Sequence, residues 1–299
     1  MSELLYAKQS GLAPHSNSTF SPVGQVDYLK LPHIPLTTFD VDREVAWMQA
    51  RSLNDASVPD GFPIPYVSPS ILGPGTQNYG PFIVNRTVRD LEPYIASPGD
   101  EYRFSNPNVD SRHAVGDNLL DVAICCMDDI GAQFFVDWTI HAVSTGKMKL
   151  TPGKFWSGNL RRREGGLVWI IDRLNKYACM ALSRAWVQKW TFRLARPEEL
   201  FARRALPLTM VYPSPNHPSY VSGHAAVAGA CAAVLALMMN DPTLESEAGA
   251  EVLALANFTF LGRWAAGIHW AKDGVDGLRL GWETVMYSNN SLPYPPSPW

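Results

Sequence analysis

Cationic and imidazole side chains recur in three short segments of the second half of this 299-residue chain. The segments are residues 189–197, 218–224 and 263–273, and together they hold three fixed positive charges, a serine hydroxyl, a glycine amide and two imidazoles. Arg, Lys and backbone N–H groups donate charge-assisted hydrogen bonds to the oxygens of tetrahedral anions. The three segments therefore predict a site for an oxyanion such as phosphate or vanadate.

His269 and Asp273 are four residues apart, a spacing that places two side chains on one face of a helix. An aspartate there accepts one imidazole N–H, fixes the tautomer and leaves the other ring nitrogen as a ligand or a nucleophile. Taken alone, the same spacing is equally compatible with an ordinary His–Asp pair on the protein surface. Arg263, six residues before His269, and residues 222–224 favour the chemical interpretation.

Ser222 and Gly223 stand directly before an apolar stretch with helical character. A hydroxyl and an amide at a helix N-terminus form a ready anion site. Helix capping by Ser222 is compatible with that role and leaves the neighbouring His224 unexplained. We expect His224 to act as a general acid or base beside the bound anion.

The three cations, Lys189, Arg196 and Arg263, have an alternative as solvated surface charges, which is where most Lys and Arg residues lie. Lys189 and Arg196 are seven residues apart on or beside an apolar helix, which predicts two positions on the same side, two turns apart. Three positive charges would offset the roughly two to three negative charges of an oxyanion.

The order and spacing of these residues resemble the signature shared by the vanadium-dependent haloperoxidases and the type 2 phosphatidic-acid phosphatase (acid phosphatase) superfamily. The matching pattern is K-x6-R-P, P-S-x-x-S-G-H and R-x5-H-x3-D, from Lys189 to Asp273. It is broken at Val221, where a proline is usual, and at Gly262, where a serine often stands. Neither change removes a charge or a ligand. The resemblance implies an all-α helical bundle of the vanadium haloperoxidase type.

The resemblance also implies a role for each matched residue. His269 would bond the vanadium, and His224 would be the acid–base group for peroxide activation. Lys189 would polarise the bound peroxide. The equatorial vanadate oxygens would be held by Lys189, Arg196, Ser222, Gly223 and Arg263; these five and His269 are called the cage below. In the phosphatases the residue matching His269 attacks phosphorus and the one matching His224 protonates the leaving alcohol, so phosphate can occupy the same site.

Two further residues favour the haloperoxidase branch. Trp186 matches a tryptophan common in haloperoxidase pockets, with core packing as the alternative. His217 matches a position that is histidine in algal bromoperoxidases and phenylalanine in fungal chloroperoxidases, with an ordinary loop residue beside Pro218 as the alternative. His217 therefore favours bromide or iodide over chloride.

The resemblance thus implies a vanadate-dependent haloperoxidase, whose partners would be hydrogen peroxide, a halide and a small organic acceptor that becomes halogenated. Two other functions stay open. One is a soluble acid phosphatase with His269 as nucleophile. The other is a redox-neutral homologue that acts on a phosphorylated or isoprenoid-like substrate or only binds an oxyanion.

Helical periodicity must supply the elements that position these residues. Apolar residues three and four apart predict helices at 117–143, 165–190, 198–205, 222–239 and 242–255, followed by a segment at 258–282 that holds the last motif. The stretch 222–239 is almost wholly apolar, which predicts a buried central helix. Residues 207–218 contain four prolines and predict a loop.

The first part of the chain has a different composition. Residues 1–110 are rich in Pro, Gly, Ser and Asn, and predict an irregular N-terminal segment packed on a helical core at 111–299 that carries the oxyanion site. One helix is expected at 40–52, where the first turn is acidic. By analogy with related enzymes this segment could be the arm of a homodimer.

Bulk properties exclude several classes of protein. A net charge of −3 and a pI near 6.2 give no reason to expect nucleic acid as a partner. The longest apolar stretches, such as 225–239, are shorter than the ~20 residues of a transmembrane helix, and no signal peptide is visible. We therefore expect a soluble protein, cytoplasmic by default. Cys125, Cys126, Cys179 and Cys231 lack paired spacing and predict buried thiols.

Overall fold

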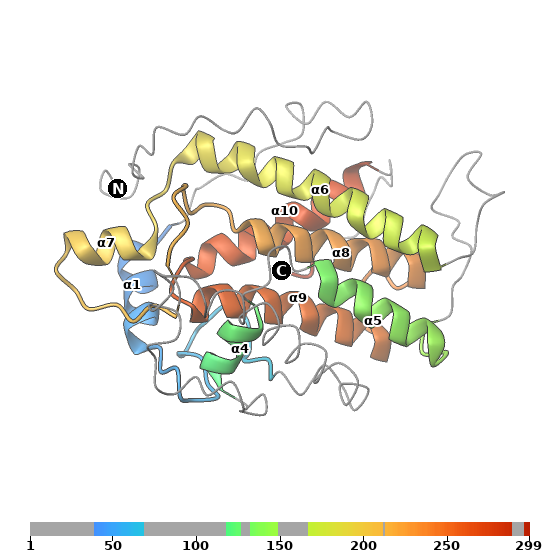
Figure 1. Ribbon diagram of the computed structural model, residues 1–299, viewed down its shortest axis with the longest axis horizontal. Coiled ribbons are helices and arrows are strands. Elements are labelled where there is room, and N and C mark those ends of the chain that lie inside the picture. Colours follow the sequence, from blue (N-terminus) through green and yellow to red (C-terminus); the bar gives the residue numbers. More distant parts are fainter. Residues whose placement is uncertain (1–38, 69–117, 127–131, 149–166, 212, 289–295) are drawn as a thin grey trace, which may run out of the picture.

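The structure, a computed structural model, describes residues 39–68, 118–126, 132–148, 167–211, 213–288 and 296–299. Within these ranges every regular element is a helix (Figure 1). The helices are α1 (Val41–Ala50), α4 (Leu119–Cys125), α5 (Ala132–Ser144), α6 (Leu167–Phe192), α7 (Pro197–Arg203), α8 (Gly223–Met239), α9 (Glu247–Ala265) and α10 (Ala271–Ser288). The predicted all-α fold is confirmed.

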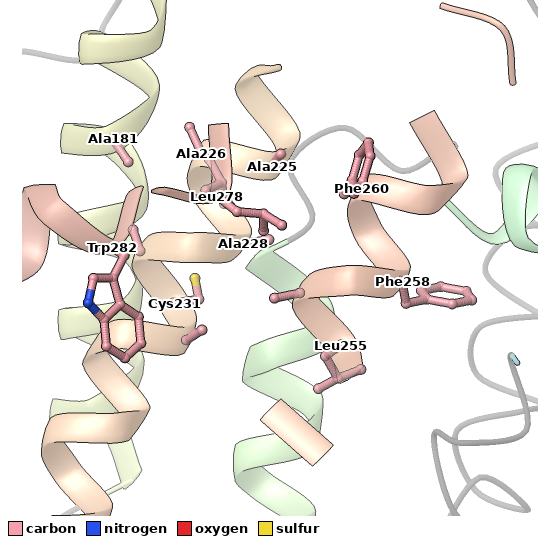
Figure 2. Packing of buried hydrophobic residues seen from close by; sticks show 14 of the residues in the cluster. Ala181, Ala225, Ala226, Ala228, Cys231, Leu255, Phe258, Phe260, Leu278 and Trp282 are labelled. Carbon is pink, nitrogen blue, oxygen red and sulfur yellow. The ribbon is translucent and has the colours of Figure 1, made fainter. Parts of the chain in front are cut away.

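Helix α8 lies at the centre of the bundle, between α6, α9 and α10. All but two of its residues are buried, which confirms the prediction of a central helix. Small residues let α10 approach closely: a Cβ at Gly229 would lie 2.0 Å from the carbonyl oxygen of Leu278, and one at Gly281 would lie 1.9 Å from that of Ala226. Figure 2 shows Ala226 and Leu278 among the buried side chains of this region.

Several helix ends follow the sequence signals. Ser222 caps α8, its hydroxyl accepting from the amide of Ala225 at 3.4 Å. Pro197 opens α7, where its missing N–H costs nothing. Helix α7 ends at Arg203, two residues before the expected end. The described residues of the proline-rich stretch 207–218 form a loop, as predicted.

Other boundaries were predicted wrongly. The helix expected at 117–143 is two helices, because α4 ends at Cys125 and α5 begins at Ala132. The break expected between 255 and 258 does not exist, since α9 begins at its cap Ser246 and continues to Ala265. Chain reversal occurs instead at Gly267, whose φ of 84° suits glycine. Residues 255–265 are all buried, so no polar face marks where the helix ends.

Part of the N-terminal region packs on the core. Helix α1 confirms the helix expected at 40–52, and its Val45 and Met48 are buried. After it, the Phe62 ring lies 4.3 Å from that of Trp264 in α9. Residues 1–38 and 69–110 lie outside the described residues, so the division of the chain at residue 110 stays a prediction.

The cysteines are only partly as predicted. Cys126 and Cys231 are buried free thiols. Cys179 is only half-buried, because it lies at the edge of the buried face that α6 packs against α8. The side chain of Cys125 lies outside the described residues. No helix in the described ranges is both long enough and apolar enough to span a bilayer.

Candidate functional site

The predicted site residues gather at one end of the bundle, where α6 and α9 end and α8 and α10 begin (Figure 1). Lys189 lies in the last turn of α6, and Arg196 directly precedes α7. The spacing predicted that Arg196 lies two turns beyond Lys189 on the same side, but Arg196 lies beyond the end of the helix, because α6 ends at Phe192 and Arg193 turns the chain with a φ of 49°. The N-termini of α8 and α10 add partial positive charge to this end.

His269 is held through one ring nitrogen. It precedes α10, so it does not share a helix with Asp273 as the spacing predicted; the first turn of α10 folds Asp273 back onto it. The Nδ1 atom lies 3.0 Å from Oδ2 of Asp273 and 3.4 Å from the hydroxyl of Ser219. Because a carboxylate accepts, Nδ1 carries the proton, and Nε2 keeps its lone pair.

Asp273 is the anchor of this arrangement. Its Oδ2 also accepts from the amide of Trp270 at 3.0 Å and from the hydroxyl of Ser219. Its Oδ1 has no hydrogen-bond partner among the described residues. Burial raises the pKa of Asp273 to about 6, against the hydrogen bond from Ser219 and the charge of Lys189. Asp273 is therefore mostly ionised at neutral pH.

The electrostatic potential at His269 is positive. Burial lowers the pKa of this imidazole well below its usual value, and the charges of Arg196, Lys189 and Arg263 lower it further. The ring is therefore neutral, with a lone pair on Nε2, and is surrounded by cations. Such surroundings stabilise an anion placed against that nitrogen.

Lys189 and Arg196 hold the loop between α7 and α8. The ammonium of Lys189 is buried and donates to the carbonyls of Pro218 at 3.0 Å and Ser219 at 2.7 Å, which uses two of its three hydrogens. Burial, and then the charge of Arg196, lower its pKa. Arg196 donates to the carbonyls of His217 at 2.8 Å and Ile268 at 2.6 Å, so it links this loop to the residue before His269.

Arg263 and His224 are in contact. Arg263 is buried in the last turn of α9, and His224 is half-buried in the first turn of α8. The guanidinium donates to Nε2 of His224, which places the proton of the neutral ring on Nδ1. Both residues therefore belong to the cluster that the sequence predicted, next to the N-terminus of α8.

The start of α8 is tied to the His269 segment. The amide of Ser222 donates to the carbonyl of Asp273 at 2.9 Å. The Ser222 oxygen accepts from Ala225, so its own hydrogen can be donated elsewhere. The amide of Gly223 opens the helix and has no acceptor within it.

Trp186 and His217 lie together at the outer side of the site. Their rings are 4.8 Å apart, and Nδ1 of His217 lies 3.1 Å from Nη2 of Arg196. Trp186 is 37% exposed, which rules out the alternative of core packing. Burial and the charges of Lys189 and Arg196 lower the pKa of His217 to about 2, so this ring is neutral.

Two residues of the site were missed from the sequence. Ser219 bonds to Asp273 and lies beside His269, and its place in the P-S-x-x-S-G-H motif could have pointed to it. Glu44 of α1 is buried and accepts from the amides of Ala271 and Lys272, directly after the His269 segment. Nothing in the sequence around Glu44 indicates this contact.

The donor set fits vanadate or phosphate. Both anions need several N–H or O–H donors and positive charge, and vanadate needs one nitrogen ligand in addition. Lys189 and Ser222 have hydrogens that the described contacts do not use, Gly223 presents a helix amide, and His269 presents Nε2. The positive potential at His269 completes the requirement.

Several known proteins are similar to the part of the chain that carries this site. A family model described as "PAP2 superfamily" matches residues 174–294. A vanadium-dependent bromoperoxidase of Corallina pilulifera is 33% identical over 102 residues, which cover 27% of this chain and 17% of that protein. One of Ascophyllum nodosum is 35% identical over 103 residues, which cover 27% and 18%. The match thus spans less than a fifth of either relative.

Among solved structures, one described as the first bacterial vanadium-dependent iodoperoxidase is similar over 89% of this chain and 61% of its own. Its sequence identity is 16% and the TM-score is 0.39.

Proposed function

We propose that the protein is a vanadate-dependent haloperoxidase, a proposal supported by the match of residues 174–294 to the family model described as "PAP2 superfamily". It would use hydrogen peroxide to oxidise bromide or iodide to the hypohalous acid, with peroxide reduced to water, and so halogenate a small organic acceptor. The observation that carries the proposal is the neutral His269, oriented by Asp273 and surrounded by buried cations.

The cage residues would hold the cofactor. His269 would bind vanadate through Nε2, while Lys189, Arg196, Ser222, Gly223 and Arg263 would donate to its oxygens. Vanadate, when bound, supplies the Lewis acidity that activates peroxide towards halide. Fixed cations in a buried site stabilise developing negative charge without having to reorganise.

The remaining residues would move protons and admit the halide. His224, half-buried beside Arg263, would exchange protons with peroxide and water. The half-exposed Trp186 and neutral His217 would form the side on which halide approaches. The histidine at position 217, and the names of the two bromoperoxidase relatives, support bromide.

An acid phosphatase is the second candidate, and the same imidazole favours it. A neutral His269 with Nδ1 bonded to a carboxylate is also a nucleophile for phosphorus. In that reaction His224 would protonate the leaving alcohol.

One experiment separates the candidates. Metal-stripped protein is assayed with and without added orthovanadate, in the presence of peroxide, bromide and a chromogenic halogen acceptor. A parallel assay contains p-nitrophenyl phosphate. Halogenation that requires vanadate supports the haloperoxidase. Phosphate release by the stripped protein, inhibited by vanadate and without halogenation, would instead make it a phosphatase. Inactivity in both assays contradicts both candidates.

A further inference from the structure

Glu44 caps the helix that follows His269. It lies on α1 and is only 3% exposed. Its Oε2 accepts from the amide of Ala271 at 2.7 Å, and its Oε1 accepts from that of Lys272 at 3.0 Å. These are the first two amides of α10, and such amides have no acceptor within their own helix. A carboxylate more than two hundred residues away in sequence therefore supplies both acceptors.

This cap determines what Asp273 can do. With Ala271 and Lys272 bonded to Glu44, Asp273 accepts from Trp270, Ser219 and His269. Without Glu44, the buried amide of Ala271 and the partly buried amide of Lys272 would lack an acceptor, which is costly. Asp273 lies in the same first turn of α10 and already accepts from the amide of Trp270, so it is the carboxylate of this turn that those amides would draw away from His269.

The residue that follows α1 holds the start of the turn between α9 and α10. Arg51, directly after α1, donates from Nη1 to the carbonyls of Trp264 at 3.0 Å and Ala265 at 2.6 Å. Its Nη2 donates to the carbonyl of Thr209. The turn between α9 and α10, which carries His269, is therefore fixed at its start by Arg51 and at its end by Glu44.

We infer that Glu44 is a positioning residue for His269: it takes the first amides of α10, leaves Asp273 to orient the imidazole, and so sets the oxyanion affinity of the cage. The inference rests on the proposed function only for the kind of ligand. It concerns the geometry of the apoprotein, so binding can test it without turnover.

Orthovanadate and inorganic phosphate are titrated calorimetrically into the stripped wild-type protein, Glu44→Gln and Asp42→Asn at pH 8. This pH is above the pKa of about 7 that burial gives Glu44. Glutamine fits the same space but offers one acceptor oxygen and turns an NH₂ towards the other amide. We expect Glu44→Gln to raise Kd by about 10- to 100-fold, the usual effect of removing the support of a ligand.

Asp42→Asn is the matched control. Asp42 lies on the same helix, its side chain is 89% exposed, and it pairs with Arg204 at 3.1 Å. We expect its Kd to equal that of the wild type. A purely structural role for Glu44 would lower the melting temperature of the stripped protein and leave Kd unchanged well below that temperature. A folded Glu44→Gln protein with wild-type Kd would overturn the inference.

Hydrogen exchange of the stripped wild type gives a second readout that does not depend on any variant folding. The amides of Ala271 and Lys272 should exchange far more slowly than unprotected amides, and rapid exchange there would overturn the cap. Failure of the proposed function is distinguishable. A phosphatase would still bind both anions, so the comparison of Kd values would stand, whereas a wild type that binds neither anion would contradict the oxyanion site itself.

Discussion

Asp273 orients His269 with a single oxygen atom. Its Oδ2 accepts hydrogen bonds from an imidazole, a hydroxyl and an amide, whereas its Oδ1 has no hydrogen-bond partner among the described residues. A carboxylate bound at one oxygen can rotate unless several donors fix that oxygen. Ser219 is the donor that comes from another segment, so it should decide how firmly the imidazole is held.

Ser219→Ala should therefore loosen His269 while leaving the core intact. We expect oxyanion affinity and kcat to fall by about tenfold, the lower end of the effect of such supporting contacts. Steady-state kinetics and calorimetry check this. Ser183→Ala is the control, because the Ser183 hydroxyl bonds, among the described residues, to the Cys179 carbonyl of its own helix. Equal loss in both variants would show that the effect is not specific to the site.

The residues of the site were predictable to the extent that they lie in the motifs. Spacing and residue type indicated Lys189, Arg196 and His269 because the chemistry of an oxyanion requires cations and a nitrogen ligand. The role of Glu44 was not predictable, because acidic residues are common in the first turn of any helix. Its role depends on a contact that only the folded chain makes.

At the scale of the helices, the site depends on the contact between α8 and α10, because each of these helices begins at the cage. Glycines at positions 229, 277 and 281 allow the two helices to approach backbone to backbone. A Cβ at Gly281 would lie 1.9 Å from the carbonyl oxygen of Ala226 and 2.5 Å from the amide of Ala230. Backbone atoms cannot yield as the end of a side chain can.

Gly281→Ala should consequently separate the two helices. We expect a loss of about 1–3 kcal/mol in the free energy of unfolding, as overpacking costs, although alanine is the better helix former. Urea unfolding followed by circular dichroism measures it. Tyr287→Ala, at a 43% exposed position of the same helix, should change stability by no more than about 0.5 kcal/mol. A Gly281→Ala protein as stable as the wild type would contradict the close packing.

The bounds of a helix were predictable where one face of the helix is polar, and they were difficult to predict where the helix is apolar on all sides. Helix α6 alternates buried and exposed positions, and its predicted range of 165–190 is close to Leu167–Phe192. The boundary between α9 and α10 was misplaced, because the end of α9 is apolar on all sides. The end of α9 before Gly267 is held by Arg51, which lies far away in sequence and donates to the carbonyls of Trp264 and Ala265.

At the scale of the whole molecule, buried neutral imidazoles should make the protein sensitive to acid. His217 has a pKa of about 2 because burial, Lys189 and Arg196 disfavour its charged form. The unfolded chain protonates this residue near pH 6.5. Below that pH the unfolded state gains a proton that the folded state does not, so stability falls as pH falls.

His217→Asn removes this contribution and keeps an acceptor facing Arg196. Its stability relative to the wild type should therefore rise by up to about 1.4 kcal/mol for each pH unit between 6.5 and 4, the value for one proton. Urea titrations of the stripped proteins across this range provide the comparison. A stability difference that does not change with pH would mean that His217 has the same pKa in the folded and unfolded states, and would contradict the lowered pKa.

The folded chain brings its N-terminal and C-terminal regions together at the site, since α1 contacts the turn between α9 and α10. The most direct measurement of what that site holds is a crystal structure of the protein soaked with orthovanadate. We predict that the anion is bonded to Nε2 of His269 and contacted by Lys189, Arg196 and Arg263. Vanadate bound elsewhere, or a His269 that makes no contact with it, would contradict the oxyanion site on which the proposed function depends.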